Sequence, residues 1–212
     1  LRTSLVLTDG TSRVVQVALV PEQDGVHSFR VFSQAQGVSG EVWTLHAAAS
    51  FVPAPPDAAA RQPDRSTIPA VAPEGFEEVP PEDLYRALSA RGLEYGPAMR
   101  GIDRVWRRNG EAFAHVSLPD LLRHEADSYL IHPALLDAAL QALAATPADS
   151  EGSADGRTWV PVGCRSVLLH GRPASALWSH AVLRSGAREA NVVEADIRLC
   201  DDSGVAVAEV AG

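Results

Sequence analysis

Apolar residues fill every position from 133 to 145 except two, Asp137 and Gln141. Leu, Ala and Gln are strong helix formers, and no Gly or β-branched residue interrupts the run. Pro133 suits the first helical position, where no backbone N–H is needed, so the pattern predicts a helix over residues 133–145. A helix that is apolar all round is normally buried, so the rest of the chain should fold over it.

The two polar residues of this helix are four positions apart and therefore lie on one face. A buried carboxylate is costly unless it is paired or protonated, and burial raises the pKa of such a group. A protonated acid beside an amide is what a general acid requires, and this favours Asp137 as the acid and Gln141 as its neighbour. The alternative is that Asp137 faces a water-filled edge or is only hydrogen-bonded in the core, and the spacing alone does not decide between them.

Short runs of alternating apolar and polar residues precede the helix, and turn signals such as Asp9-Gly10 and Asp24-Gly25 separate them. These runs cover residues 4–7, 13–20, 27–33 and 43–47. They predict a meander of antiparallel strands over residues 1–52 without a helix of its own. Because a sheet with one apolar face cannot stand alone, it must cover something.

Residues 53–81 hold eight of the fifteen prolines, which predicts an extended or disordered linker. An amphipathic helix is expected next, over residues 84–90, with Gly92 just past its end. Further strands are expected on either side of the central helix in the sequence. They are predicted at residues 102–107 and 111–118, joined by a type I′ turn at Asn109-Gly110, and at residues 158–169, 176–183, 191–199 and 205–210. The fold class is therefore α+β, with antiparallel strands before and after one central helix.

Composition and charge narrow the function classes. The chain has 212 residues, of which 46% are hydrophobic and 21% charged, as in globular proteins of one large or two small domains. A net charge of −9 argues against nucleic acid as a partner, and no apolar run approaches the length of a membrane span. Cys164 and Cys200 are interpreted as reduced structural thiols of a cytoplasmic protein, and no metal-ligand spacing or nucleotide-binding loop is present.

The segment HPALLDAALQ, residues 132–141, resembles the Asp-bearing helix motif of dehydratase domains from modular type I polyketide synthases. Those domains have a double hotdog fold, in which each half is an antiparallel sheet wrapped around one long helix. The resemblance implies that residues 82–212 form the C-terminal hotdog around helix 133–145. It also implies that residues 1–52 are remnant strands of the N-terminal hotdog, joined to it by the linker 53–81.

Two further segments resemble parts of the family's substrate tunnel. Residues 92–99 partly match a GYxYGPxF element, with Leu93 in place of the first Tyr and Met99 in place of Phe. The local alternative for Tyr-Gly-Pro is a structural corner. Residues 159–162, WVPV, resemble a segment that narrows the pocket. The tunnel residues implied are Tyr95, Gly96, Pro97, His132, Pro133, Val160 and Pro161.

The resemblance also implies a reaction. Family members eliminate water from a β-hydroxyacyl thioester held on the phosphopantetheine arm of acyl carrier protein. A His base removes the α-proton, and the Asp, here Asp137, donates a proton to the departing hydroxyl, while Gln141 orients the acid or the leaving group. No metal or redox cofactor is implied. The partners implied are acyl carrier protein, neighbouring synthase domains and a second copy of the chain in a homodimer.

The family's His base lies in the pattern HxxxGxxxxP, and none of the seven histidines of this chain fits it. His46, in a predicted strand, is interpreted as a structural residue. The sequence thus predicts a truncated fragment or a degenerate relative that is inactive on its own. Two alternatives stay open: a dehydratase-like cyclase that forms pyran rings, and a non-catalytic hotdog that serves as a structural or acyl-binding module.

Overall fold

The computed structural model describes residues 1–37, 42–52, 74–146, 159–172, 175–189 and 192–212. The chain divides into two compact units, Leu1–Arg61 and Gln62–Gly212. Within the described residues, no helix is long and apolar enough to cross a membrane.

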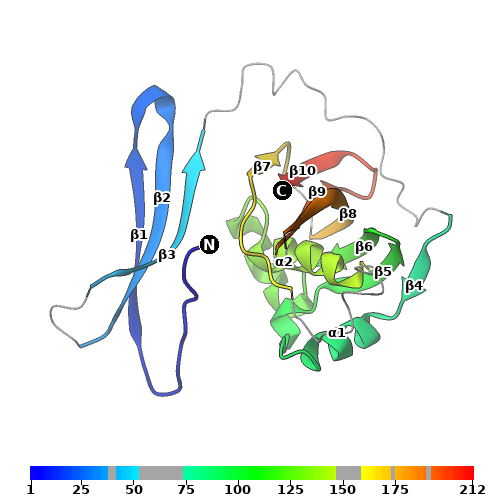
Figure 1. Ribbon diagram of the computed structural model, residues 1–212, viewed down its shortest axis with the longest axis horizontal. Coiled ribbons are helices and arrows are strands. Elements are labelled where there is room, and N and C mark those ends of the chain that lie inside the picture. The colour runs from blue at the N-terminus through cyan, green and yellow to red at the C-terminus, as the bar shows by residue number, and fades with distance from the viewer. Residues whose placement is uncertain (38–41, 53–73, 147–158, 173–174, 190–191) are drawn as a thin grey trace. The chain divides into compact units, whose positions relative to one another are not determined.

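The first unit holds one antiparallel sheet in the order β1-β2-β3. Its strands are β1 Arg13–Pro21, β2 His27–Ala35 and β3 Thr44–Phe51, with a 3-10 turn, η1 Gln23–Gly25, between the first two (Figure 1). The strand predicted at residues 4–7 is wrong, because this run is exposed and forms no ladder. Near it, the backbone N–H of Arg2 donates to the carbonyl of His46 at 2.7 Å.

His46 is a structural residue of this first sheet. Its ring is buried, with Nδ1 2.9 Å from the carbonyl oxygen of Thr3 and Nε2 2.7 Å from the hydroxyl of Ser33. Because a carbonyl only accepts, Nδ1 carries the proton and Nε2 accepts from Ser33. Both ring nitrogens are therefore satisfied inside the first unit, in agreement with the structural interpretation of this histidine.

The second unit is a seven-stranded antiparallel sheet in the order β4-β5-β6-β8-β9-β10-β7. Its strands are β4 Glu77–Val79, β5 Ile102–Arg108, β6 Glu111–Ser117, β7 Ser166–Leu169, β8 Ala176–Glu189, β9 Val192–Cys200 and β10 Ala206–Ala211. Its helices are α1 Pro81–Ser89 and α2 Pro133–Gln141, with 3-10 turns η2 Pro97–Met99, η3 Asp120–Ser128 and η4 Ala142–Ala145. Residues 77–79, which fall inside the predicted linker 53–81, form β4 and pair with β5.

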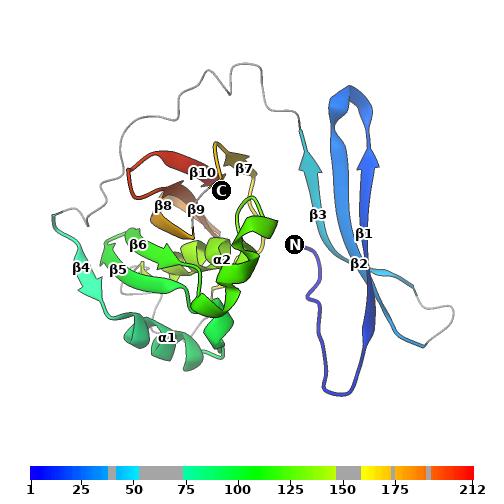
Figure 2. The same ribbon diagram turned by 180° about the vertical axis from the view of Figure 1, so that it is seen from behind.

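Helix α2 packs against β5, β6 and β8, and the sheet curves around it (Figure 2). The side chains of Ala138, Ala139 and Ala142 have no exposed surface, and small residues there let the sheet approach the helix closely. The predicted sheet around a central helix is thus confirmed. The helix is α-helical only to Gln141, and its last four predicted residues form the 3-10 turn η4.

Two local predictions are wrong. The turn at Asn109-Gly110 joins β5 to β6, but only Gly110 has a positive φ, of 72°, whereas a type I′ turn needs two such residues. The strand predicted at residues 158–169 is short, because only Ser166–Leu169 pairs with β10. Residues 159–165 are exposed and belong to no strand, so their apolar, β-branched composition did not make them one.

Candidate active site

The N-terminus of α2 is fixed by its own sequence. Pro133 occupies the first turn, as predicted, and His132 is the N-cap residue. The ring nitrogen Nδ1 of His132 accepts a hydrogen bond from the backbone N–H of Ala134 at 3.1 Å. This bond satisfies one of the N–H groups that a helix start leaves free, and it fixes Asp137 one turn further along.

Asp137 and Gln141 meet on one face of α2, as their spacing predicts. The Nε2 of Gln141 donates to Oδ2 of Asp137 at 2.6 Å. The prediction that α2 is buried on all sides is wrong, because Leu136, Asp137 and Leu140 are only partly buried. The carboxyl group is therefore hydrogen-bonded to a buried amide on one side and still reachable on the other.

Two groups from elsewhere in the second unit hold the amide of Gln141. The hydroxyl of Tyr85, on α1, donates to Oε1 of Gln141 at 3.0 Å, and Nε2 of Gln141 also donates to the carbonyl oxygen of Met99 at 2.9 Å. The hydroxyl of Tyr85 in turn accepts from the backbone N–H of Ile102 at 3.2 Å. Sequence reasoning missed Tyr85, whose only local signal is a place on the apolar face of the amphipathic helix.

The Tyr-Gly-Pro segment lies beside this network. The rings of Tyr85 and Tyr95 are 6.0 Å apart, and burial, followed by the negative charge of Asp137, raises the pKa of Tyr95. Gly96 caps the turn η2, so the segment is a corner as expected, but the φ of Gly96 is −75° and needs no glycine. Gly96 and Pro97 are exposed, whereas Tyr95 is partly buried.

The phenol of Tyr85 gives a prediction for stability at high pH. Burial raises its pKa to about 12, compared with about 10 for an unfolded tyrosine. The folded state keeps this proton longer, so its contribution is complete below about pH 10 and is lost as the pH rises toward about 12. We expect urea denaturation of the chain to show up to about 2 kcal/mol of stability lost over this interval.

The control for this experiment is Tyr85→Phe, whose stability should change less between about pH 9 and about pH 11 because the phenol is gone. All 18 basic side chains of the Lys+Arg group are arginine, so no lysine titrates in the same range. Equal slopes for the two proteins would contradict a protonated, buried Tyr85.

Gly101 lets the start of β5 pass close to helix α2. A Cβ at this position would lie 2.7 Å from the carbonyl oxygen of Ser117 and 2.9 Å from Cβ of Ala138. The carbonyl of Gly101 also accepts from the N–H of Ser117 at 2.8 Å. This contact fixes the distance between the sheet and the helix at the residue next to Asp137.

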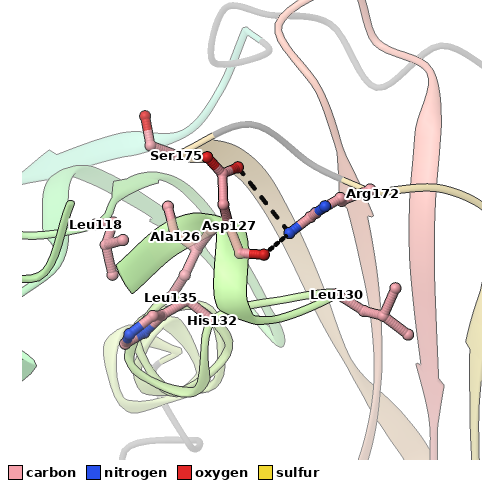
Figure 3. A pocket seen from close by; sticks show the side chains of 8 residues that line it. All are labelled: Leu118, Ala126, Asp127, Leu130, His132, Leu135, Arg172 and Ser175. Carbon is pink, nitrogen blue, oxygen red and sulfur yellow. Dashed lines mark hydrogen bonds and ion pairs between the residues drawn. The ribbon is translucent and has the colours of Figure 1, made fainter. Parts of the chain in front are cut away.

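A cavity of about 340 Å³ lies on another side of α2 (Figure 3). Its lining residues are Leu118, Ala126, Asp127, Leu130, His132, Leu135, Arg172 and Ser175. Leu135 and Asp137 are two positions apart, or about 200° around the helix, so the cavity does not share the face of Asp137. The Nε2 of His132 is buried without a hydrogen-bond partner among the described residues, and Oε2 of Glu125 is 3.9 Å away. A tunnel role for His132 stays a prediction.

The other residues predicted for the tunnel are exposed in this structure. Pro133 is exposed at the start of α2, and Val160 and Pro161 lie in the exposed segment before β7. The structure therefore brings together Asp137, Gln141 and Tyr95, and it adds Tyr85 and the carbonyl of Met99. The tunnel assignments of Gly96, Pro97, Pro133, Val160 and Pro161 stay predictions.

Comparison with known proteins places this chain in a family. Residues 63–212 match the family model described as the polyketide synthase dehydratase N-terminal domain. The chain is 34% identical over 214 residues to polyketide synthase GfsE of Streptomyces halstedii, with all of this chain and 5% of that protein covered. The chain spans between 2% and 12% of the length of the curated relatives compared.

Solved structures show the same fold. The dehydratase domain from the CurK module of curacin polyketide synthase is 25% identical, with a TM-score of 0.72 over 98% of this chain and 68% of that one. Two mutants of CurK dehydratase are described as inactive, one with Asp changed to Asn and one with His changed to Phe. The bifunctional dehydratase-cyclase domain of ambruticin biosynthesis is 31% identical, with a TM-score of 0.70 over 94% of this chain and 66% of that one.

Proposed function

The chain belongs to the dehydratase family of polyketide synthases, and on this premise we propose that Asp137 is the general acid of a β-hydroxyacyl dehydration. The observation that carries the proposal is the 2.6 Å hydrogen bond from the buried Gln141 amide to Oδ2 of Asp137. It holds a partly exposed carboxyl group in one orientation on the central helix. A proton donor has to be placed in this way to meet a leaving group.

The elimination needs two protein groups, a base and an acid. A base takes the α-proton of the acyl chain, the electrons of that C–H bond form the α,β double bond, and the bond from the β-carbon to oxygen breaks. Hydroxide is a poor leaving group, so the proton of Asp137 passes to this oxygen and water departs. The resulting carboxylate of Asp137 is stabilised by the N–H of Gln141 and regains its proton from solvent or from the base.

The base is proposed to be a histidine of the family's HxxxGxxxxP pattern, which none of the seven histidines of this sequence fits. The inactive Asp and His mutants of CurK dehydratase support the need for one residue of each kind. We therefore propose that these 212 residues do not turn over substrate alone. The substrate would arrive on the phosphopantetheine arm of acyl carrier protein, with neighbouring synthase domains and a second copy of the chain as further partners.

The experiment compares the chain alone with a fusion to the His-bearing N-terminal segment of the CurK dehydratase domain. Both receive a β-hydroxyacyl pantetheine thioester, and loss of water is followed by mass spectrometry. We expect turnover by the fusion only. A folded fusion that binds the thioester without dehydrating it would favour the non-catalytic acyl-binding module, and turnover by the chain alone would contradict the need for an added base.

A second function, ring closure, is favoured by the 31% identity to the bifunctional dehydratase-cyclase domain. In that reaction a distal hydroxyl of the substrate adds to the β-carbon of the new double bond and a cyclic ether forms. The same fusion would be given a β-hydroxyacyl thioester that carries a second, distal hydroxyl. A product that has lost water and also lacks a double bond would identify a cyclase. An open-chain unsaturated product would show that dehydration is the only reaction.

A further inference from the structure

We propose that Tyr85 is a positioning residue for the dehydration, because it holds Gln141 on Oδ2 of Asp137 and leaves Oδ1 to carry the proton that is transferred. The proposal deepens the function proposed above and rests on Asp137 as the general acid. It concerns a residue of α1 that lies 52 positions before Asp137 in the sequence and that carries no motif of its own.

The direction of the Tyr85 hydrogen bond follows from its two partners. The backbone N–H of Ile102 can only donate, so the phenol oxygen is its acceptor at 3.2 Å. The phenol proton is then free for Oε1 of Gln141 at 3.0 Å. Tyr85 is 7% exposed and burial raises its pKa to about 12, so it is a donor throughout the neutral range.

The amide of Gln141 has one orientation that satisfies all of its partners. Its oxygen faces the donor Tyr85, and its nitrogen faces two acceptors, the carbonyl oxygen of Met99 and Oδ2 of Asp137. A flipped amide would set Oε1 against both of those acceptors, which is unfavourable for a side chain only 5% exposed. Tyr85 is therefore the third hydrogen-bond partner, beside Met99 and Asp137, that fixes the orientation of the Gln141 amide.

The locked amide distinguishes the two carboxyl oxygens of Asp137. Oδ2 receives an N–H from Gln141 at 2.6 Å, so a proton placed on Oδ2 would point at a donor or displace it. The neutral acid therefore carries its proton on Oδ1. Without the phenol, the amide of Gln141 can rotate about its last bond, and the acid loses the fixed orientation that proton transfer needs.

The test is a double-mutant cycle in the active fusion, with Tyr85→Phe, Gln141→Ala and both together. We expect Tyr85→Phe to lower kcat about tenfold with KM changed less than about twofold, which corresponds to one lost hydrogen bond. In the Gln141→Ala background, Tyr85→Phe should have no further effect on kcat, because Tyr85 acts through Gln141. Tyr129→Phe, which removes a hydroxyl outside this network, is the matched control and should leave kcat unchanged.

The proposal would be overturned if the loss of kcat in the double variant equalled the product of the two single losses. It would also be overturned if Tyr85→Phe changed KM and left kcat unaltered. If Asp137→Asn leaves kcat unchanged, the proposed function itself fails, whatever Tyr85 does. A second measurement does not need turnover: in the 212-residue chain, Tyr85→Phe should speed hydrogen exchange of the Gln141 side-chain amide in NMR spectra. Unchanged exchange in a folded variant would also contradict the role of Tyr85.

Discussion

Replacement of Asp137 by asparagine in the active fusion is expected to lower kcat for dehydration by about 10² to 10⁴-fold. Asparagine has the same size as aspartate, and its oxygen can still accept from Nε2 of Gln141, so α2 keeps its packing. The amide cannot give up a proton to the β-hydroxyl. The loss should therefore appear in kcat, measured at saturating β-hydroxyacyl thioester, with urea stability unchanged within about 0.5 kcal/mol.

Asp103→Asn is the matched control for this substitution. Asp103 lies on β5, is 44% exposed, and accepts from the hydroxyl of Ser117 at 2.9 Å while Oδ2 is 3.0 Å from Nδ1 of His115. It belongs to the same unit and undergoes the same change of carboxyl to amide, yet it contacts neither Gln141 nor Tyr85 in any hydrogen bond described above. If Asp103→Asn and Asp137→Asn reduced kcat equally, a general effect of replacing a carboxyl group in this unit, and not loss of the acid, would explain both.

The parts of the site that the sequence predicts are those set by local chemistry. Pro133 begins the helix because its ring suits the first turn, and Asp137 meets Gln141 because they are one turn apart. Both outcomes depend on fewer than ten neighbouring residues. The hotdog arrangement, in contrast, is what the resemblance of residues 132–141 to dehydratase domains implies, and the strand patterns on either side of the helix agree with it.

The parts that the sequence does not predict depend on partners far along the chain. Tyr85 reaches Gln141 across 56 positions and the carbonyl of Met99 reaches it across 42, and a backbone carbonyl has no signature in a sequence. The wrong strand at residues 4–7 has a similar origin. An apolar run becomes a strand only where a neighbouring strand can pair with it through backbone hydrogen bonds. The tertiary structure decides where such a strand lies.

Gly101→Ala is expected to destabilise the chain by about 3 kcal/mol, a large part of the stability of a typical domain. The new Cβ would lie 2.7 Å from the backbone oxygen of Ser117. Ser117 is paired with Ala176 of β8, and its N–H donates to the carbonyl of Gly101, so this oxygen cannot rotate away as a side chain could. Its other neighbour, Cβ of Ala138, belongs to α2 and moves only with the helix. Either β5 or α2 must therefore shift. If α2 shifts, Ala138 and the neighbouring Asp137 move with it.

Urea denaturation of the 212-residue chain measures this loss, and Gly171→Ala is its control. Among the described residues no heavy atom lies within 4 Å of a Cβ at Gly171, so its effect should stay within about 0.5 kcal/mol. In the active fusion, Gly101→Ala should also reduce kcat, whereas Gly171→Ala should not. A stable Gly101→Ala chain with full activity would mean that β5 and α2 can separate without disturbing the acid, and that the close approach at Ala138 does not position Asp137.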